Sequence, residues 1–358
     1  GSSPWWIQWY KNSQPISDAT NLTVNFIATA SDNGAVIYAV ATNLYTNVQF
    51  TAISSNAILT VINDTNPPVV QRVMSVSTNG VKVVFSEPIL INDLTNASNY
   101  SLVGQGAVIK GITAGAYNSE AIINTDPLVA GAIYTITISN LRDMAAAANL
   151  LQSTNISFIA APYTVYDINQ SVPGGYLIAN PDGFEIGGGG TGIGDNSDQF
   201  SSAFDQKSGD FDYQMRVKSI NSVDLWAKVG LMARETLSQG SKYAAVLSMP
   251  SVVGAVFEYR ATNDTMSALV GNIPPNYPDC WLRLKRQGIT FTGFASVDGK
   301  MWIKLGSKDI TMSDPIYVGM VISSHSNGVI ATAQISGMSE PTSTLEGRLS
   351  QKYEPPGP

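Results

Sequence analysis

The sequence predicts an all-β protein made of three tandem β-sandwich domains, and three observations lead to this prediction. Short segments of alternating apolar and polar residues recur from end to end, separated by Asn, Gly, Asp and Pro turns, as half-buried strands require. Helical periodicity is nearly absent. Charged residues make up only 13% of the 358-residue chain, and Val, Ile, Thr and Tyr are abundant, which favours strands.

Six segments carry the clearest strand pattern. They are VKVVF (81–85), YTITI (134–138), FDYQMRV (211–217), YAAVL (243–247), VFEYR (256–260) and FTGFASV (291–297). The best helical candidate is DMAAAANLLQ (143–152), for which we expect one or two turns.

Two breaks divide the chain into units. NDTNPPVV (63–70) places two prolines between strand-like runs, and FIAAPYTVYD (158–167) precedes a region richer in Trp and charge. A polar, proline-terminated segment closes the chain and is expected to be a linker or tail. The predicted boundaries are 1–64, 65–161 and 162–340 for the three units, and 341–358 for the tail.

The composition limits the classes of partner. The net charge is −7 and the pI is near 4.7, which argues against nucleic acid. No apolar run reaches the roughly 18 residues of a membrane span, so we expect no membrane-spanning segment in this sequence. Cys280 is the single cysteine, so no intrachain disulfide can form. A β-rich chain with so little charge leads us to expect an extracellular or cell-surface location.

The first unit contains the stretches IQWYKNSQPI, SDNGAVIYAVATN and SSNAILTVI. Together they resemble the later half of a bacterial immunoglobulin-like (Ig-like) domain. The resemblance implies that Trp9 fills the core from the third strand, and that Asp32 and Gly34 form the turn into the sixth strand. The family's Tyr and Cys fall on Val36 and Tyr38, so both hallmark residues are absent.

The resemblance leaves out the first two strands of such a domain. Trp5, Trp6 and Trp9 would then lie beside open sheet edges, which a neighbouring copy of the chain could complete by strand addition. A cut through a longer protein explains the same apolar stretch, and both explanations stay open.

The second unit contains NPPVVQRVMSV, VKVVFSEPI, NASNYSL and YTITISNLRD, which resemble a second bacterial Ig-like module of surface-layer and secreted proteins. This implies a spacer with Phe85 and Tyr134 pointing inward. In the third unit, WAKVGLMARET, WLRLKRQGITFTGFASVDGKMWIKLG and IYVGMVISSHSNG resemble a bacterial concanavalin A-like module appended to β-xylosidases. That resemblance implies a two-sheet jelly-roll sandwich of lectin or glucanase type, without implying activity.

Catalytic residues are not evident. Active glucanases of this fold carry alternating acids on one strand, which supply the two carboxylates of hydrolysis. The nearest match is Asp210 and Asp212, and Asp210 falls in a turn. His325 is the only histidine, so histidine-based triads and metal sites lack members. Cys280 has no activating neighbour in the sequence. We therefore expect a protein that is not an enzyme.

The glycine-rich stretch GGGGTGIG (187–194) matches a dinucleotide fingerprint formally, but no helix follows it, so we expect a loop. Asp195 and Asp198 follow the glycines. Oxygen ligands suffice for calcium, so either a calcium site or a plain acidic turn explains them. No other cofactor is expected.

Strand parity in the third unit places cationic and polar side chains on one face of each strand. Of the 20 Lys and Arg residues, 13 fall in this unit, and we expect several strands to present them on a single sheet face. The candidate glycan-binding residues are Arg216, Arg234, Glu258, Arg260, Trp281, Arg283 and Lys285. Arginine pairs well with uronate or sulfate, whereas a solvated outer face explains the same pattern. Trp226 and Trp302 are expected in the core or at its rim.

Two functions follow as alternatives. The first is a non-catalytic glycan-binding region of a large extracellular protein, whose Ig-like spacers present a lectin-like module to a polysaccharide or cell-surface glycan. The second is a structural subunit of a surface layer, adhesin stalk or filament, assembled with copies of itself at the incomplete first unit.

Overall fold

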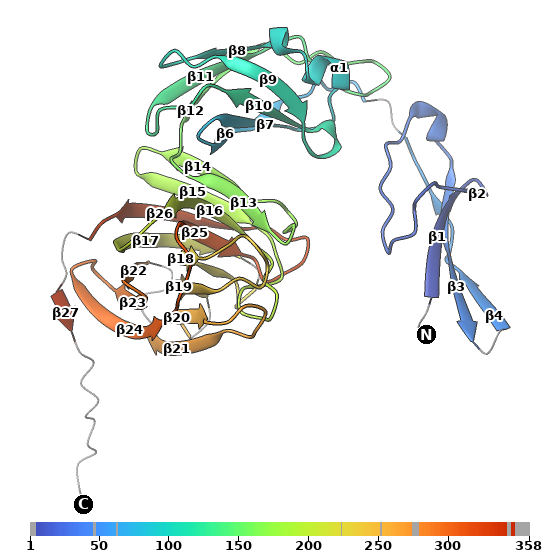
Figure 1. Ribbon diagram of the computed structural model, residues 1–358. Coiled ribbons are helices and arrows are strands. Elements are labelled where there is room, and N and C mark those ends of the chain that lie inside the picture. Colours follow the sequence, from blue (N-terminus) through green and yellow to red (C-terminus); the bar gives the residue numbers. More distant parts are fainter. Residues whose placement is uncertain are drawn as a thin grey trace, which may run out of the picture.

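The computed structural model describes residues 5–45, 48–61, 64–222, 224–250, 253–273, 279–341 and 345–347. Strands make up 54% of the structure and helices 4%, which confirms the predicted all-β class (Figure 1). Among the described residues, no helix is long and apolar enough to cross a membrane.

The first unit is one five-stranded sheet in the order β2-β1-β3-β4, with β5 also paired to β3. Its elements are β1 (Trp5–Lys11), β2 (Gln14–Pro15), the 3-10 helix η1 (Ala30–Asp32), β3 (Val36–Tyr45), β4 (Val48–Ile53) and β5 (Ala57–Ile58). Phe50, Ile53 and Ile58 are exposed, and the buried apolar clusters found among the described residues contain none from this unit.

The second unit encloses its own core between two sheets. Four strands pair in the order β6-β7-β10-β9 and face three strands in the order β12-β11-β8. The strands are β6 (Val70–Ser77), β7 (Gly80–Phe85), β8 (Tyr100–Val103), β9 (Ile109–Ala114), β10 (Glu120–Thr125), β11 (Ile133–Ile138) and β12 (Thr154–Ile159). The short helices are α1 (Ile91–Leu94), η2 (Ala97–Asn99) and η3 (Ala116–Asn118). Phe85 and Tyr134 are buried in this core as predicted.

The predicted helix over 143–152 is wrong, because this segment forms turns and isolated bridges. The buried Asp143 carboxylate accepts hydrogen bonds from the backbone N–H groups of Ala145 and Asn149 (3.1 and 2.9 Å) and from the Asn149 side chain. An aspartate that binds nearby N–H groups in this way favours a turn over a helix.

The third unit is a larger sandwich. Its seven-stranded sheet has the order β13-β16-β25-β18-β19-β20-β21, with β13 (Thr164–Ile168), β16 (Phe200–Lys207), β18 (Lys228–Arg234), β19 (Tyr243–Ser248), β20 (Ala255–Arg260), β21 (Ala268–Ile273) and β25 (Ile316–Ser323). The opposing strands run β27-β24-β23-β22-β17-β26-β15-β14 and continue into β12 of the second unit. They are β14 (Tyr176–Asn180), β15 (Gly183–Gly188), β17 (Phe211–Asn221), β22 (Cys280–Gln287), β23 (Thr290–Ser296), β24 (Met301–Asp309), β26 (Ala331–Ser339) and β27 (Leu345–Gly347).

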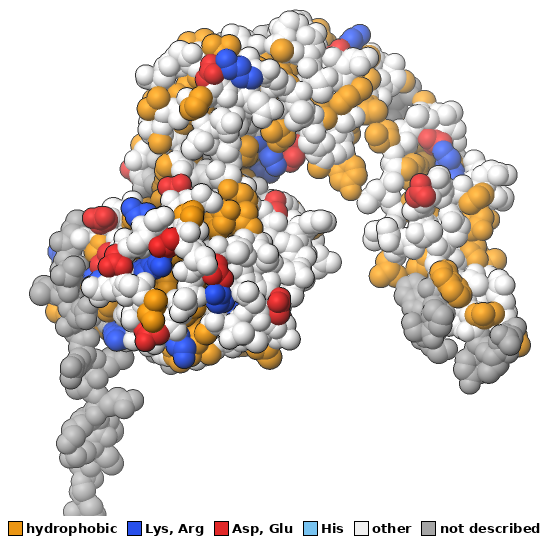
Figure 2. Space-filling view, viewed as in Figure 1, with side chains coloured by type: hydrophobic (Ala, Val, Ile, Leu, Met, Phe, Trp, Pro, Cys, Tyr) orange, Lys and Arg blue, Asp and Glu red, His pale blue; other side chains and the backbone are white. Residues whose placement is uncertain are grey.

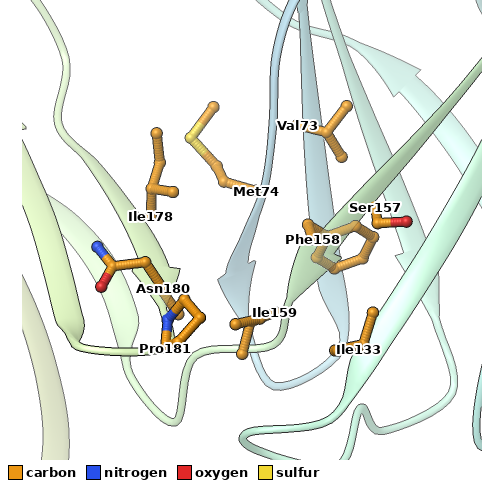
Figure 3. A pocket seen from close by; sticks show the side chains of 10 residues that line it. Val73, Met74, Ile133, Ser157, Phe158, Ile159, Ile178, Asn180 and Pro181 are labelled. Carbon is orange, nitrogen blue, oxygen red and sulfur yellow. The ribbon is translucent and has the colours of Figure 1, made fainter.

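The second and third units thus share an eleven-stranded sheet, joined where Ile159 of β12 pairs with Ala179 of β14. Across the joint, the Arg72 guanidinium lies 4.5 Å from the centre of the Tyr176 ring. An apolar cavity of about 250 Å³ opens here, with Met74 among its lining residues (Figure 3). The two units therefore meet through one backbone pairing and the contact of Arg72 with Tyr176.

The seven-stranded sheet is buried on both faces, which a simple sandwich does not require. Leu231, Val246 and Phe257 point toward the eleven-stranded sheet and join the main core. On the opposite face, which we call the outer face of the seven-stranded sheet, Met232 and Leu247 lie in a second buried cluster. The loops that close over this outer face build the candidate site.

Candidate functional site

The predicted binding residues lie on two different sheets and do not form one surface. Glu258, Arg234 and Arg260 project from the outer face of the seven-stranded sheet. The others lie on the outer face of the eleven-stranded sheet, on the far side of the main core: Arg216, Trp281, Arg283 and Lys285. The prediction of a single cationic face is therefore wrong. Parity assigns side chains to the faces of a strand, but it does not say which strands share a sheet.

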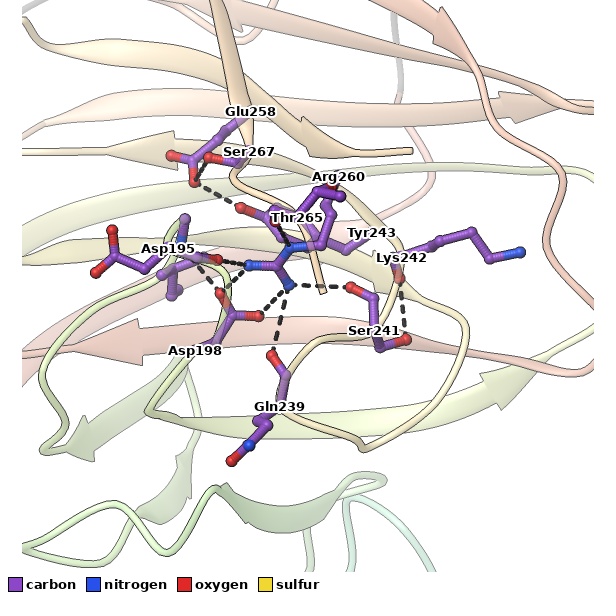
Figure 4. Close-up of polar contacts among 12 residues, drawn as sticks. Asp195, Asp198, Gln239, Ser241, Lys242, Tyr243, Glu258, Arg260, Thr265 and Ser267 are labelled. Atoms are coloured by element: carbon purple, nitrogen blue, oxygen red, sulfur yellow. Dashed lines mark hydrogen bonds and ion pairs between the residues drawn. The ribbon is translucent and has the colours of Figure 1, made fainter. Parts of the chain in front are cut away.

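Arg234 and Arg260 are fully buried, where an exposed cationic face was expected. Both guanidinium groups hold the carboxylate of Asp198, with N···O distances of 2.7 Å. Figure 4 shows the contacts of Arg260. Arg234 also donates to the backbone carbonyls of Thr236 and Ser238. This buried cluster ties the loop after the glycine-rich stretch to the loop between β18 and β19.

Arg260 extends the same cluster to two further loop segments. Its guanidinium donates to the carbonyl oxygens of Thr265 (2.6 Å) and Asp195. Guanidinium groups therefore occupy both carboxylate oxygens of Asp198, which is 0% exposed. Calcium at Asp198 would have to displace these two charges, so this carboxylate fits an ion-paired loop anchor better than a calcium ligand.

Glu258 is the centre of a second polar cluster on the same face. Its carboxylate accepts hydrogen bonds from Tyr243 (2.6 Å), Lys228 (2.7 Å) and Ser267 (3.1 Å). Burial raises the pKa of Tyr243 well above its ordinary value, so the phenol stays protonated and donates. The Lys228 ammonium also donates to the carbonyl of Ile193 at 2.6 Å, so Lys228 secures the glycine-rich loop as well.

Beside Glu258 the loops leave an open cavity of about 210 Å³, which we call the outer-face cavity. The glycine-rich loop supplies Thr191, Gly192, Ile193, Gly194 and Asp195, and the remaining lining residues are Trp226, Lys228, Glu258, Ser267, Leu269 and His325. The Trp226 side chain is 50% exposed and the Glu258 side chain 1%. A buried carboxylate and an accessible indole therefore line the same small chamber.

Glycine is needed in the loop where it passes over this cluster. Gly194 has φ +123°, and a Cβ there would lie 2.6 Å from Oε1 of Glu258. Gly190 has φ +105°, and a Cβ would lie 2.1 Å from the carbonyl of Gln199. Only glycine combines this backbone conformation with so close an approach. Gly187 and Gly188 belong to β15, so the loop that the sequence predicts begins after them, and its residues 191–195 line the outer-face cavity.

The rim residues Trp226 and His325 are linked through Asp224. The Asp224 carboxylate accepts the backbone N–H of Trp226 at 2.7 Å and lies 3.2 Å from Nδ1 of His325. These contacts, with the Trp226 N–H the largest cause, hold the pKa of Asp224 below its ordinary value. Sequence reasoning placed Trp226 in the core or at its rim and discounted His325, because neither belongs to a recognisable motif.

On the outer face of the eleven-stranded sheet, Arg216 and Arg283 are paired as well. Arg216 forms two hydrogen bonds with Asp279, at 2.7 and 2.6 Å, and Arg283 forms two with Asp212 at the same distances. Arg283 is 0% exposed, and its guanidinium lies 5.6 Å from the centre of the ring of Trp302, which is buried.

Asp210, Asp212 and Cys280, which the sequence analysis weighed as catalytic candidates, have structural roles. Asp212 neutralises Arg283, and Asp210 accepts the backbone N–H of Gly288 at 2.7 Å. Cys280 is buried, and this burial raises the pKa of its thiol to about 11. Because the thiolate is the reactive form, this cysteine is inert near neutral pH.

At the predicted assembly edge, Trp6 is 53% exposed. The Trp9 indole donates to the carbonyl of Asn21 at 2.9 Å. The side chain of Trp5 lies outside the described residues. Strand addition at this edge stays a prediction.

A cluster of three acids that the sequence reasoning missed lies where the first unit meets the second. Oxygen atoms of Asp64, Glu87 and Asp143 lie within 4.8 Å of one another. Burial, followed by the charges of Asp64 and Asp143, raises the pKa of Glu87. Carboxylates so placed have ligand chemistry suited to a hard cation. The three residues are far apart in sequence, which explains why no motif revealed them.

Comparisons with known proteins find a family match in one part of the chain. Residues 56–159 match the bacterial Ig-like domain family, a range that spans nearly all of the second unit. No curated protein matches the chain.

Solved structures show only slight similarity. A functionally unknown protein from Saccharomyces cerevisiae has 16% identity, covers 49% of this chain and 94% of its own, and has a TM-score of 0.40. Domains 1–6 of the bacterial surface-layer protein SbsC have 12% identity over 79% of this chain and 55% of that chain, with a TM-score of 0.26. A xylan β-1,4-xylosidase from Bacillus halodurans has 10% identity over 85% and 74%, with a TM-score of 0.34.

Proposed function

We propose that this chain is a non-catalytic carbohydrate-binding region of an extracellular or cell-surface protein. The observation that carries the proposal is the outer-face cavity, in which accessible Trp226 and buried Glu258 line one chamber. In this arrangement the Ig-like unit is a spacer that is joined to the binding unit through the shared sheet.

The chemistry of the cavity suits a sugar ring. An indole provides a flat apolar surface for the C–H face of a pyranose. Around it, Ser267, Lys228 and Glu258 provide hydrogen-bonding groups fixed by their own contacts. A volume of about 210 Å³ is below the roughly 300–1,000 Å³ of sites for drug-sized ligands. One sugar residue at a chain end or branch therefore fits better than an extended chain.

The hydrogen bonding of Glu258 favours binding over hydrolysis. A glycosidase needs one carboxyl group as acid and a second as base or nucleophile. Here Tyr243 and Ser267 donate to Oε1 of Glu258, and Lys228 donates to Oε2. A carboxylate held by three donors is committed to its neighbours. It therefore suits a fixed part of a binding site better than a group that transfers a proton or attacks a sugar.

Affinity electrophoresis against soluble polysaccharides tests the proposal. We expect at least one polysaccharide to retard the intact chain, and Trp226→Ala to reduce the retardation about tenfold or more because the stacking surface is lost. Tyr117→Ala is the matched control, since Tyr117 is an exposed aromatic residue of the second unit. It should migrate like the parent chain.

Thermal unfolding of both variants separates loss of binding from loss of folding. Equal retardation of the parent and the Trp226→Ala variant by every polysaccharide would place binding elsewhere. Absence of any retardation would remove the proposed function.

The first unit favours a second candidate, a structural subunit assembled by strand addition. β4 ends the strand order of its sheet, and its apolar residues Phe50 and Ile53 are 57% and 67% exposed. An edge strand with exposed apolar side chains is a template for pairing. Sedimentation velocity should then show species larger than the monomer that disappear when Phe50 and Ile53 are both changed to Ser. A parent chain that is monomeric at all concentrations would exclude this candidate.

A further inference from the structure

We infer that the outer-face cavity selects uncharged or amine-bearing sugars and rejects uronates and sulfated sugars. This inference rests on the proposed function and concerns the class of glycan. It reverses the expectation from the sequence, in which clustered arginines favoured acidic glycans.

Among the described residues, the ammonium and guanidinium groups of the Lys and Arg side chains in and below the cavity are already shared with protein acceptors. Lys228 is the only Lys or Arg in the described lining, and it is only 12% exposed. Its ammonium is shared between Glu258 and the carbonyl of Ile193. Arg234 and Arg260 lie deeper, with their donors directed at Asp198 and backbone carbonyls. An acidic sugar needs such donors to be available, because charge-assisted pairs supply its recognition.

Asp195 is the acidic side chain of the lining that is open to a ligand, because the Glu258 carboxylate is 1% exposed and already holds three donors. Asp195 lines the cavity at its exposed edge. Its backbone carbonyl is used by Arg260, whereas no hydrogen bond or ion pair of its carboxylate is found among the described residues. Asp224 lies behind His325 at 3.2 Å. A uronate entering here would meet the Asp195 carboxylate, and like charges repel.

The hydrogen-bonding role of a carboxylate sets which ligand groups can bind at the cavity mouth. A carboxylate is an acceptor only, so the Asp195 carboxylate calls for ligand donors. Sugar hydroxyls meet that need, and a protonated amine meets it with added charge attraction. Asp195 therefore acts as a specificity residue at the mouth of the cavity, and Glu258 has the same sign of charge inside.

The experiment uses the whole chain in affinity gels that contain polysaccharides of three kinds. Neutral gels contain xylan, hydroxyethyl cellulose or galactomannan, amine gels contain glycol chitosan, and acidic gels contain polygalacturonate, alginate or carboxymethyl cellulose. Because the chain has a net charge of −7, non-specific attraction to the amine gel is expected. Trp226→Ala, which has the same net charge, measures that background.

We expect Trp226-dependent retardation in a neutral or amine gel and none in any acidic gel. Asp195→Asn should then weaken binding to an amine-bearing glycan about fivefold, as expected for one charge at the cavity mouth. It should leave binding to a neutral glycan within about twofold. Ser197→Asn is a neighbouring exposed control that keeps the carboxylate, and should change neither.

The outcomes separate the two proposals. Trp226-dependent retardation by an acidic gel would overturn the charge selectivity while supporting carbohydrate binding. Binding to an amine-bearing glycan that Asp195→Asn leaves unchanged would remove the assigned role of Asp195. Retardation that does not depend on Trp226 in any gel would overturn the proposed site, and the selectivity with it.

Discussion

Both outer faces of the third unit carry ion pairs of arginine with aspartate, but these pairs differ in how deeply they are buried. On the seven-stranded sheet, Arg234 and Arg260 share Asp198, and all three side chains are 0% exposed. On the eleven-stranded sheet, Arg216 pairs with Asp279 while the two side chains stay 39% and 48% exposed. The difference lies in the loops, which cover the first face and leave this part of the second open to water.

Coverage by loops changes both the energetics and the use of such a pair. A charge taken out of water depends on its partner, because removal of that partner leaves an uncompensated ion in a poorly solvating environment. An exposed pair keeps its hydration and is worth little. The covered face can therefore hold loops in place around a cavity. Figure 2 shows that the charged side chains visible in that view lie mostly on the third unit.

The largest predicted effect breaks the buried cluster. Asp198→Asn should lower the free energy of unfolding by about 3–5 kcal/mol, because it removes the charge that two buried guanidinium groups share. The matched change Asp279→Asn on the open face should cost about 0–1 kcal/mol. Urea unfolding of the two variants gives the comparison, and losses of similar size would show that burial does not set the difference.

A change of intermediate size concerns the loop that roofs the cavity. Gly194→Ala requires a strained backbone and places a methyl group against Glu258, so we expect a loss of about 1–3 kcal/mol and loss of sugar binding. Gly209→Ala is the control, because Gly209 also has positive φ (+74°) but a Cβ added there would meet no atom within 4 Å. It should cost about 1 kcal/mol and leave binding intact. Calorimetry and affinity gels measure the two effects, and equal losses of binding would refute a role for contact with Glu258.

The smallest predicted effect concerns Glu87, whose carboxylate has no paired cation among the residues that the structure describes. Burial and the charges of Asp64 and Asp143 raise the pKa of Glu87, so ionisation of Glu87 opposes folding above that pKa. Glu87→Gln should therefore stabilise the chain at pH 7 by a few tenths of a kcal/mol. The gain should shrink as the pH falls through the raised pKa, because the parent residue then becomes protonated too.

Asp279 gives the opposite sign for the same measurement. Arg216 lowers the pKa of Asp279, so its stabilising contribution is present above the unfolded pKa of about 4 and is lost as the pH falls through the lower folded value. Stability measured from pH 7 downward should show the Glu87→Gln gain shrink, and the Asp279→Asn loss begin to shrink only below the unfolded pKa of about 4. A Glu87→Gln gain that grows on acidification would contradict the assigned cause.

Local patterns predicted the sides of strands well and the grouping of strands poorly. Met232 and Arg234 share the outer face, as do Glu258 and Arg260, because alternation along one strand is a local property. Their separation from Arg283 depends on which strands pair, and that pairing joins segments far apart in sequence. The turn around Asp143 escaped prediction because the run of alanines that follows it favours a helix, whereas the Asp143 carboxylate captures the backbone N–H groups instead.

The amino-acid order by itself determined the all-β class, the inward faces of strands such as those of Phe85 and Tyr134, and the loop character of the glycine-rich stretch after β15. These follow from side-chain alternation and from backbone preferences that act over a few residues. Only the tertiary structure decided that Asp198 pairs with two buried arginines, and that Trp226 and Glu258 line one cavity. These residues lie on different loops and strands, and long-range strand pairing sets the distances between them.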